Sequence, residues 1–242
     1  MRLLNTATSA FAEQGLPPFP FPYAVLSHTW GTQEVSYDDM LNGQFMFKDG
    51  FKKVENFQAC ARDLGYDWCW MDTCCINRSR STSEQNEAVM SMYTWFRHAG
   101  LCVVYLTDVE RREDFTKARW FTRAWTLIEL LAPENMAFYT RDWQCIGSKK
   151  ELAAEITAHT NIAFDVLTYA RNPRDATIGE KLSWASERHA TNPEEEIYIL
   201  ISLLGVRMIR SPGEGRAMAT VRMQAQILEH LEDYTILMWH KP

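Results

Sequence analysis

Residues 101–106 read LCVVYL, a continuous apolar run that is typical of a strand in a sheet covered on both faces. Strand patterns also occur at 23–27, 66–72 and 136–140, and segments with helical apolar spacing lie between them. These helical segments are 48–64, 82–98 and 120–131. Regular alternation of strand and helix is typical of a parallel sheet with helices on its faces. The sequence therefore predicts an α/β fold built on a parallel sheet.

Composition divides the chain into three expected parts. Residues 1–22 are expected to form an N-terminal extension, because the proline-rich stretch GLPPFPFP at 15–22 favours little regular structure. Residues 23–146 hold the α/β pattern, and residues 147–242 are expected to be helical and to belong to the same unit. The helices expected there are 148–160, 177–190, 192–204 and 214–233.

Charge and composition exclude several classes of protein. The net charge is −6 and basic residues occur only as isolated pairs, so no nucleic-acid partner is expected. No apolar run approaches the length of a transmembrane helix, and no signal peptide is recognisable. The six cysteines lie mostly in apolar segments and two of them are adjacent, which indicates reduced thiols in a cytoplasmic protein. Their spacing lacks the pairs that bind zinc, so no metal site is expected.

The segment WFTRAWTLIELLAP at 120–133 places a single carboxylate, Glu129, in an otherwise apolar run. Glu129 follows Trp125 by four residues, a spacing that brings two side chains to one face of a helix. Because a carboxylate is costly to bury among apolar groups, Glu129 is a candidate catalytic residue. The structural alternative is that Glu129 lies at the helix edge and forms an ion pair with Arg119 or Arg123.

Polar residues follow three of the predicted strands where each strand ends. In open parallel sheets, ligands bind beside the carboxyl ends of the strands, so these residues are expected to line one cleft. They are Ser27, His28, Thr29, Trp30 and Gly31 after the first strand, Asp72, Thr73 and Asn77 after the second, and Thr107 and Asp108 after the third. The structural alternative is that Ser27 and Asp72 cap neighbouring helices and that Trp30 packs in the core.

Three blocks of sequence resemble the signature motifs of the fungal heterokaryon incompatibility (HET) domain. They are YAVLSHTWG (23–31), WCWMDTCCIN (68–77) and RAWTLIELLAP (123–133). The segments MRLLNTATS (1–9), KLSWASERHAT (181–191) and EEEIYILISLLGV (194–206) also look like members of this family, so the likeness spans nearly the whole chain. The segment PGEG at 212–215 departs from it, because the family usually has tyrosine before GEG.

The resemblance implies a role in fungal non-self recognition, with programmed cell death as its outcome. It also implies a TIR- or flavodoxin-like sheet followed by a helical C-terminal half. The segment from Trp125 to Leu130 resembles the TIR pattern WCxxEL, whose glutamate cleaves NAD⁺ in enzymatic TIR domains. Glu129 takes the place of that glutamate, and Thr126 stands where many TIR domains have cysteine.

This TIR likeness implies NAD⁺ as a substrate, with no cofactor, and a role for each candidate residue. Glu129 would stabilise an oxocarbenium-like transition state. Trp30 and Trp125 would stack on the nicotinamide or adenine ring, and Arg123 would pair with the pyrophosphate. The remaining residues would shape the loops or orient the ribose; they are Ser27, His28, Gly31, Asp72 and Asn77.

The family also implies self-association on activation and a separate sensor protein as partner. The rival interpretation is an adaptor without enzymatic activity, whose contact surface is the charged loop at 107–118.

Overall fold

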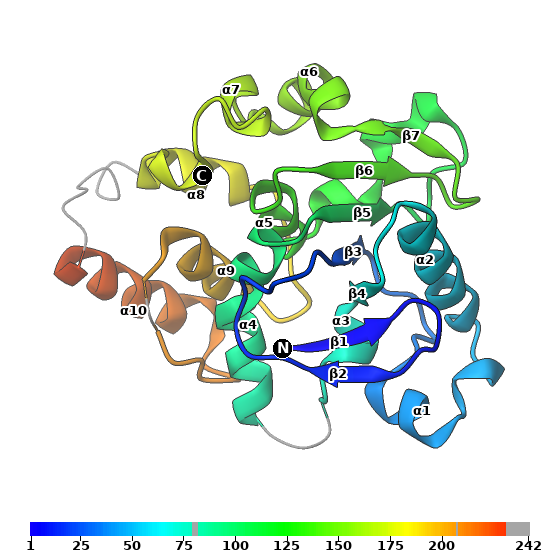
Figure 1. The fold of residues 1–242 in the computed structure, drawn as a ribbon. Helices are drawn as coiled ribbons and strands as arrows, with labels where there is room; N and C mark the ends of the chain where they lie inside the picture. Colours follow the sequence, from blue (N-terminus) through cyan, green and yellow to red (C-terminus); the bar gives the residue numbers. More distant parts are fainter. Residues whose placement is uncertain (79–81, 207, 231–242) are drawn as a thin grey trace.

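The computed structural model describes residues 1–78, 82–206 and 208–230. Its centre is a seven-stranded sheet in the order β2-β1-β4-β3-β5-β6-β7 (Figure 1). The strands are β1 (Arg2–Asn5), β2 (Phe11–Glu13), β3 (Ala24–His28), β4 (Trp68–Trp70), β5 (Leu101–Tyr105), β6 (Met136–Tyr139) and β7 (Cys145–Ser148). The four central strands are parallel, as the sequence predicts, and β3 and β5 hold the middle of the sheet.

The two edges of the sheet were not predicted. β1 pairs antiparallel with both β2 and β4, and β7 pairs antiparallel with β6. The expected N-terminal extension at 1–22 therefore supplies two strands, and Leu3 and Leu4 are fully buried in the core. These edge strands are only three or four residues long, too short to show a two-residue periodicity in the sequence.

Helices cover the sheet and then continue as a helical C-terminal half. The larger ones are α2 (Phe51–Asp63), α4 (Thr82–Arg97), α5 (Thr126–Leu131), α6 (Lys149–Thr160), α8 (Ile178–Ala185), α9 (Glu195–Leu204) and α10 (Gly215–His230). Short ones are α1 (Tyr37–Asn42), α3 (Asp72–Cys75), α7 (Phe164–Leu167), η1 (Phe45–Phe47), η2 (Arg112–Lys117), η3 (Arg119–Thr122) and η4 (Pro173–Asp175). The predicted helical half is thus confirmed; residues 231–242 lie outside the described part.

The helical half packs against the sheet unit through α9. Every residue of α9 from Ile197 to Leu204 is buried, and the helix lies beside α4, α5, α8 and α10 (Figure 1). A second apolar cluster forms around α9, and Trp125 packs against both this cluster and the main core. The beginning of α9 is therefore held close to the sheet end that carries the predicted site residues.

The helix expected over 120–131 is interrupted. A short 3-10 turn, η3, precedes α5, and Trp125 is the residue that caps α5. The Thr126 hydroxyl donates to the carbonyl oxygens of Trp120 and Arg123, at 2.5 and 2.8 Å, in competition with helical bonds. An isolated backbone bridge between Arg123 and His189 also joins this segment to the helical half.

None of the helices in the described residues combines the length and the apolar composition needed to cross a bilayer.

Candidate active site

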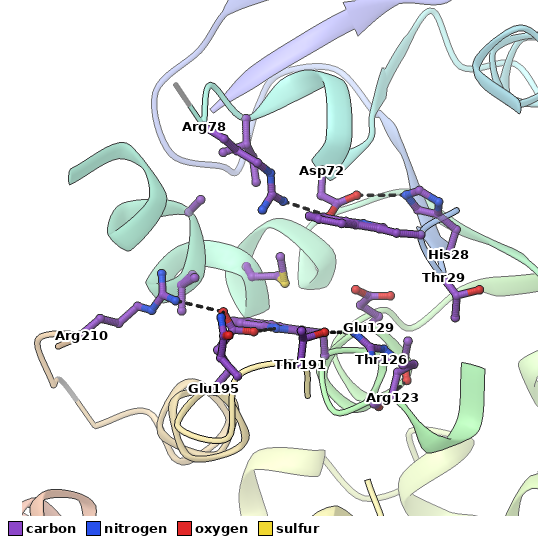
Figure 2. Close-up of a pocket in the computed structure, with 17 residues that line it drawn as sticks. His28, Thr29, Asp72, Arg78, Arg123, Thr126, Glu129, Thr191, Glu195 and Arg210 are labelled. Carbon is purple, nitrogen blue, oxygen red and sulfur yellow. Dashed lines mark hydrogen bonds and ion pairs between the residues drawn. The ribbon is translucent and has the colours of Figure 1, made fainter. Parts of the chain in front are cut away.

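A pocket of about 430 Å³ lies at the carboxyl ends of β3 and β4, between the sheet and the helical half. Its size is in the range of small-molecule sites. It is lined by His28, Thr29, Trp30, Asp72, Ile76, Arg78, Ala88, Val89, Met92, Arg123, Trp125, Thr126, Glu129, Thr191, Asn192, Glu195 and Arg210. Asp72 and Arg78 lie on one side, Thr191 and Glu195 lie opposite, and Glu129 lies between them (Figure 2).

Glu129 is a buried wall residue of this pocket, with 9% of its surface exposed. Its Oε2 atom accepts a hydrogen bond from the Ser27 hydroxyl, and the Ser27 oxygen accepts one from the Trp120 indole nitrogen at 2.7 Å. Because an indole only donates, the hydroxyl proton of Ser27 is available for Glu129, and Ser27 links Trp120 to the carboxyl group.

Burial raises the pKa of the Glu129 carboxyl to about 8. The Ser27 hydrogen bond and the positive charges of Arg188 and Arg123 lower it, whereas the negative charge of Asp72 raises it. Neither Arg119 nor Arg123 is within ion-pair distance of Glu129 in the described structure, so the ion pair offered as the structural alternative is not formed. Glu129 is consequently a mostly protonated acid at neutral pH.

The His28 ring is held by two charged residues, Lys53 and Asp72. Lys53 donates to its Nδ1 atom at 2.8 Å, so the ring proton lies on Nε2 and is donated to Asp72 at 3.0 Å. Lys53 also pairs with Glu34 at 2.5 Å, and Glu34 accepts the Gly31 backbone N–H at 2.6 Å. This network fixes the loop after β3 and leaves His28 with no ring nitrogen free to act as a base.

Asp72 is the ionised counterpart of Glu129. Burial alone would raise its pKa, but the hydrogen bonds from His28 and Trp30 and the positive charge of Arg78 bring it below its usual value. Asp72 also accepts the Trp30 indole N–H at 2.9 Å, and the Arg78 guanidinium stacks 4.2 Å from the centre of that indole. The pocket thus holds two carboxyl groups whose pKa values are driven apart.

The opposite wall comes from α9 and the segment before it. The Trp125 indole donates to Glu195 at 3.0 Å, and Arg210 donates to the other oxygen of Glu195 at 3.3 Å. Arg123 makes one long contact, 3.5 Å, with the Thr191 hydroxyl. Within the described part of the chain, no carboxylate pairs with Arg123, which leaves its guanidinium available for an anionic group.

No three His, Cys, Asp or Glu side chains gather in a metal-binding arrangement within residues 1–78, 82–206 and 208–230. All six cysteines are free thiols, and Cys69, Cys74, Cys75 and Cys102 are buried. The pocket chemistry therefore rests on carboxyl, guanidinium and indole groups.

The sequence model of the family described as "Heterokaryon incompatibility protein (HET)" matches residues 23–115. The chain carries a HET domain. The matched range includes β3, β4 and β5 with His28, Trp30 and Asp72, and it contains the first two of the three sequence motifs, 23–31 and 68–77. The predicted family is confirmed. Glu129 lies beyond the matched range, so its assignment rests on the pocket.

A curated relative supports the same family. "Vegetative incompatibility protein HET-E-1" from Podospora anserina is 37% identical over 219 residues, which make up 85% of this chain and 16% of the relative. The chain therefore spans about a sixth of that relative's length. No solved structure matches this HET domain.

The fold brings most of the predicted site residues of the HET domain to one pocket. Those that line it are His28, Trp30, Asp72, Arg123, Trp125 and Glu129. Ser27 lies behind Glu129 and holds it. Gly31 and Asn77 are outside the lining among the described residues: the Gly31 N–H binds Glu34, and the buried Asn77 donates its backbone N–H to Glu84 at 3.0 Å.

The contributions of the helical half were not predicted as parts of the site. Glu195 and Arg210 line the pocket although they lie far along the chain, and the positive charge of buried Arg188 acts on Glu129. A signal was present for Arg188 and Glu195, because they fall in the family-like segments KLSWASERHAT and EEEIYILISLLGV. Arg210 lies in neither segment.

Proposed function

We propose that this chain is an effector of heterokaryon incompatibility, which acts in the cytoplasm in non-self recognition and programmed cell death by cleaving NAD⁺ in the pocket around Glu129. The HET domain and the vegetative incompatibility relative support the biological role. The observation that carries the chemistry is a buried carboxyl group, held by Ser27, at the wall of a ligand-sized pocket.

NAD⁺ cleavage breaks the bond between ribose C1′ and the nicotinamide nitrogen. The bonding electron pair goes to that nitrogen, so neutral nicotinamide leaves without needing a proton. The ribose becomes oxocarbenium-like, and water then attacks C1′ and loses a proton. An ionised Glu129 beside C1′ stabilises the developing positive charge in a site of low dielectric, where such stabilisation is large.

The protonation of Glu129 fits a cationic substrate. Burial favours the neutral acid and raises the pKa of Glu129 to about 8. A nicotinamide ring carries a positive charge, and a positive charge near a carboxyl group favours its ionised form. Binding of NAD⁺ would therefore drive the proton off Glu129 and generate the carboxylate only when substrate is present.

Other groups of the pocket match the remaining parts of the substrate. The indoles of Trp30 and Trp125 offer faces for stacking on nicotinamide or adenine. Arg123 would bind the pyrophosphate, because it has no carboxylate partner within the described residues. Asp72, held by His28, would orient a ribose hydroxyl.

The proposal includes two kinds of protein partner. Activation would involve self-association of the domain, and a separate sensor protein would supply the trigger. No nucleic acid, membrane or cofactor takes part in the proposed reaction.

The contacts of the charged loop favour the enzyme over the adaptor. Asp114 pairs with Arg111 at 3.3 Å and with Lys117 at 2.8 Å, and Arg112 pairs with Glu155 of α6. These charges are largely compensated by neighbours in the same chain, so they make a weak surface for a charged partner.

Expression in fungal cells separates the two functions. Glu129→Gln should abolish both cell killing and the fall in cellular NAD⁺, whereas the double reversal Arg111→Glu and Lys117→Glu should leave both unchanged. The reversed side chains are about three-quarters exposed, at 74% and 76%, so the fold should tolerate them. Killing that survives Glu129→Gln but not the charge reversal would refute the enzyme and support the adaptor.

A further inference from the structure

Arg188 follows α8 and is one of the most deeply buried charged side chains of the described structure, with 3% of its surface exposed. Its Nη1 atom donates to the Arg123 carbonyl oxygen at 3.1 Å and to the Thr126 hydroxyl at 2.9 Å. Both acceptors lie at the beginning of α5, the helix that carries Glu129. The contacts therefore fix the guanidinium against the base of the pocket, on the side away from the ligand space.

The guanidinium of Arg188 lacks a matching anion. No carboxylate is within 4.0 Å of it in the described residues, and its buried Nη2 atom has no hydrogen-bond partner there. Burial lowers the pKa of Arg188 only to about 10, so the group stays charged at neutral pH. Burying a cation without a partner costs the folded state free energy. We therefore expect such a cation to stabilise an anion that forms nearby.

Glu129 is the carboxyl group that interacts with this charge. The positive charge of Arg188 favours the ionised form of Glu129, and a charge on Glu129 in turn stabilises Arg188. Thr126, which accepts a hydrogen bond from Arg188, lies three residues before Glu129 on α5, and no ion pair joins Arg188 to Glu129 within the described residues. This is the arrangement expected when the carboxyl group is protonated in the resting state and ionises only during function.

We propose that Arg188 is a positioning residue for Glu129, whose buried guanidinium supplies the compensating charge that stabilises the Glu129 carboxylate when a ligand enters the pocket. The consequence for catalysis rests on the proposed function, but the electrostatic coupling does not. Other charged or titratable groups also face Glu129: Asp72 after β4, Arg123 before α5 and Cys102 on β5. Of the two cations, Arg188 is buried, whereas Arg123 is partly exposed to solvent that screens its charge.

The test is a direct titration of the Glu129 carboxyl by difference infrared spectroscopy on the full chain, with Glu129→Gln used to assign its band. In Arg188→Gln the midpoint should rise by about 1 pKa unit or more, the shift expected when a nearby opposite charge in a buried site is removed. Glutamine removes the charge but keeps a polar N–H donor.

Two variants separate charge from structure. Arg188→Lys keeps a positive charge, so the Glu129 midpoint should stay within about 0.5 unit of wild type. Thr126→Val removes a hydrogen bond to Arg188 but no charge, and should likewise move the midpoint little. If Arg188→Gln does not fold, a shift of about 1 unit or more in folded Arg188→Lys overturns the proposal, and a midpoint within 0.5 unit supports it.

The outcomes distinguish this proposal from the proposed function. An unchanged midpoint in folded Arg188→Gln, or an equal rise in Arg188→Gln and Thr126→Val, would overturn the role of Arg188 whatever the wild-type activity. A raised midpoint in Arg188→Gln, in a protein that releases no nicotinamide from NAD⁺, would leave the coupling standing and the proposed function refuted. Where wild type is active, Arg188→Gln should also shift the rising limb of the pH–rate profile upward.

Discussion

Replacing Glu129 with glutamine should stabilise the folded chain at neutral pH, even though Glu129 is the proposed catalytic residue. Burial raises the pKa of this carboxyl group from 4.5 to about 8 on folding. Between these two values the folded chain binds a proton that the unfolded chain has lost. The free energy of unfolding therefore falls as the pH rises through this window.

The size of the effect follows from the shift. Each pKa unit corresponds to about 1.4 kcal/mol, so the wild type should lose about 3 kcal/mol of stability between pH 4.5 and 7, and about 4 kcal/mol by pH 8. Glutamine has nearly the same shape, and its carbonyl oxygen can accept the Ser27 hydroxyl, but it carries no charge at any pH. It should therefore match the protonated wild type at low pH and exceed the wild type at neutral pH.

Urea unfolding, followed by tryptophan fluorescence at about pH 5, 7 and 8.5, measures the difference directly. The advantage of Glu129→Gln should grow with pH. Glu214→Gln is a control for which the change in stability should have the opposite sign. Burial alone would raise the pKa of Glu214, but hydrogen bonds from Tyr198 and Arg222 bring it below its usual value. That variant should be less stable than wild type at neutral pH. A difference between Glu129→Gln and wild type that stays constant with pH would refute the buried, protonated Glu129.

Three further predictions concern the same network and the core. Ser27→Ala should cost about 1–3 kcal/mol of stability in urea at pH 5, because it leaves the buried Trp120 indole N–H without an acceptor; no loss would mean that this bond is unimportant. Burial lowers the pKa of Lys149 to about 7, so the folded chain binds fewer protons than the unfolded chain between pH 7 and 10.5, and wild-type stability should rise with pH there. Thermal melts of Lys149→Met should lack this rise, and an identical rise in both proteins would contradict the assignment. Calorimetry of NAD⁺ binding at pH 7 in buffers of different ionisation enthalpy should detect release of up to about 0.9 proton in wild type, and none in Glu129→Gln; equal release in both would place the proton elsewhere.

The parallel centre of the sheet was predictable because its strands are buried on both faces. LCVVYL at 101–106 shows this burial as a continuous apolar run, and Cys102, Val103 and Val104 are fully buried. The edge strands β1, β2 and β7 were not predictable, because they are short, only partly buried and take their conformation from pairing with a neighbour. The interruption before α5 likewise depends on pairing with His189, which no local pattern reveals.

The candidate site also contains some residues that were predictable from the sequence and others that were not. Glu129 was predictable as a lone carboxylate among apolar residues, and His28 and Asp72 were predictable because they follow parallel strands. Glu195 and Arg188 were not predictable, because their contacts join distant parts of the chain. Glu195 accepts a hydrogen bond from Trp125, 70 residues earlier, and Arg188 donates one to Thr126, 62 residues earlier. Whether the predicted residues bind NAD⁺ stays a prediction.

The most direct test of the proposed function is chromatographic measurement of nicotinamide released from NAD⁺ by concentrated or artificially clustered protein. Wild type and Glu129→Gln are compared, with Glu214→Gln as a partly buried carboxylate outside the pocket, and circular dichroism verifies that all three are folded. We predict release by wild type and by Glu214→Gln, and none by Glu129→Gln. Equal release by wild type and Glu129→Gln would contradict the assignment of Glu129, and no release by any of the three under clustering would contradict NAD⁺ cleavage itself.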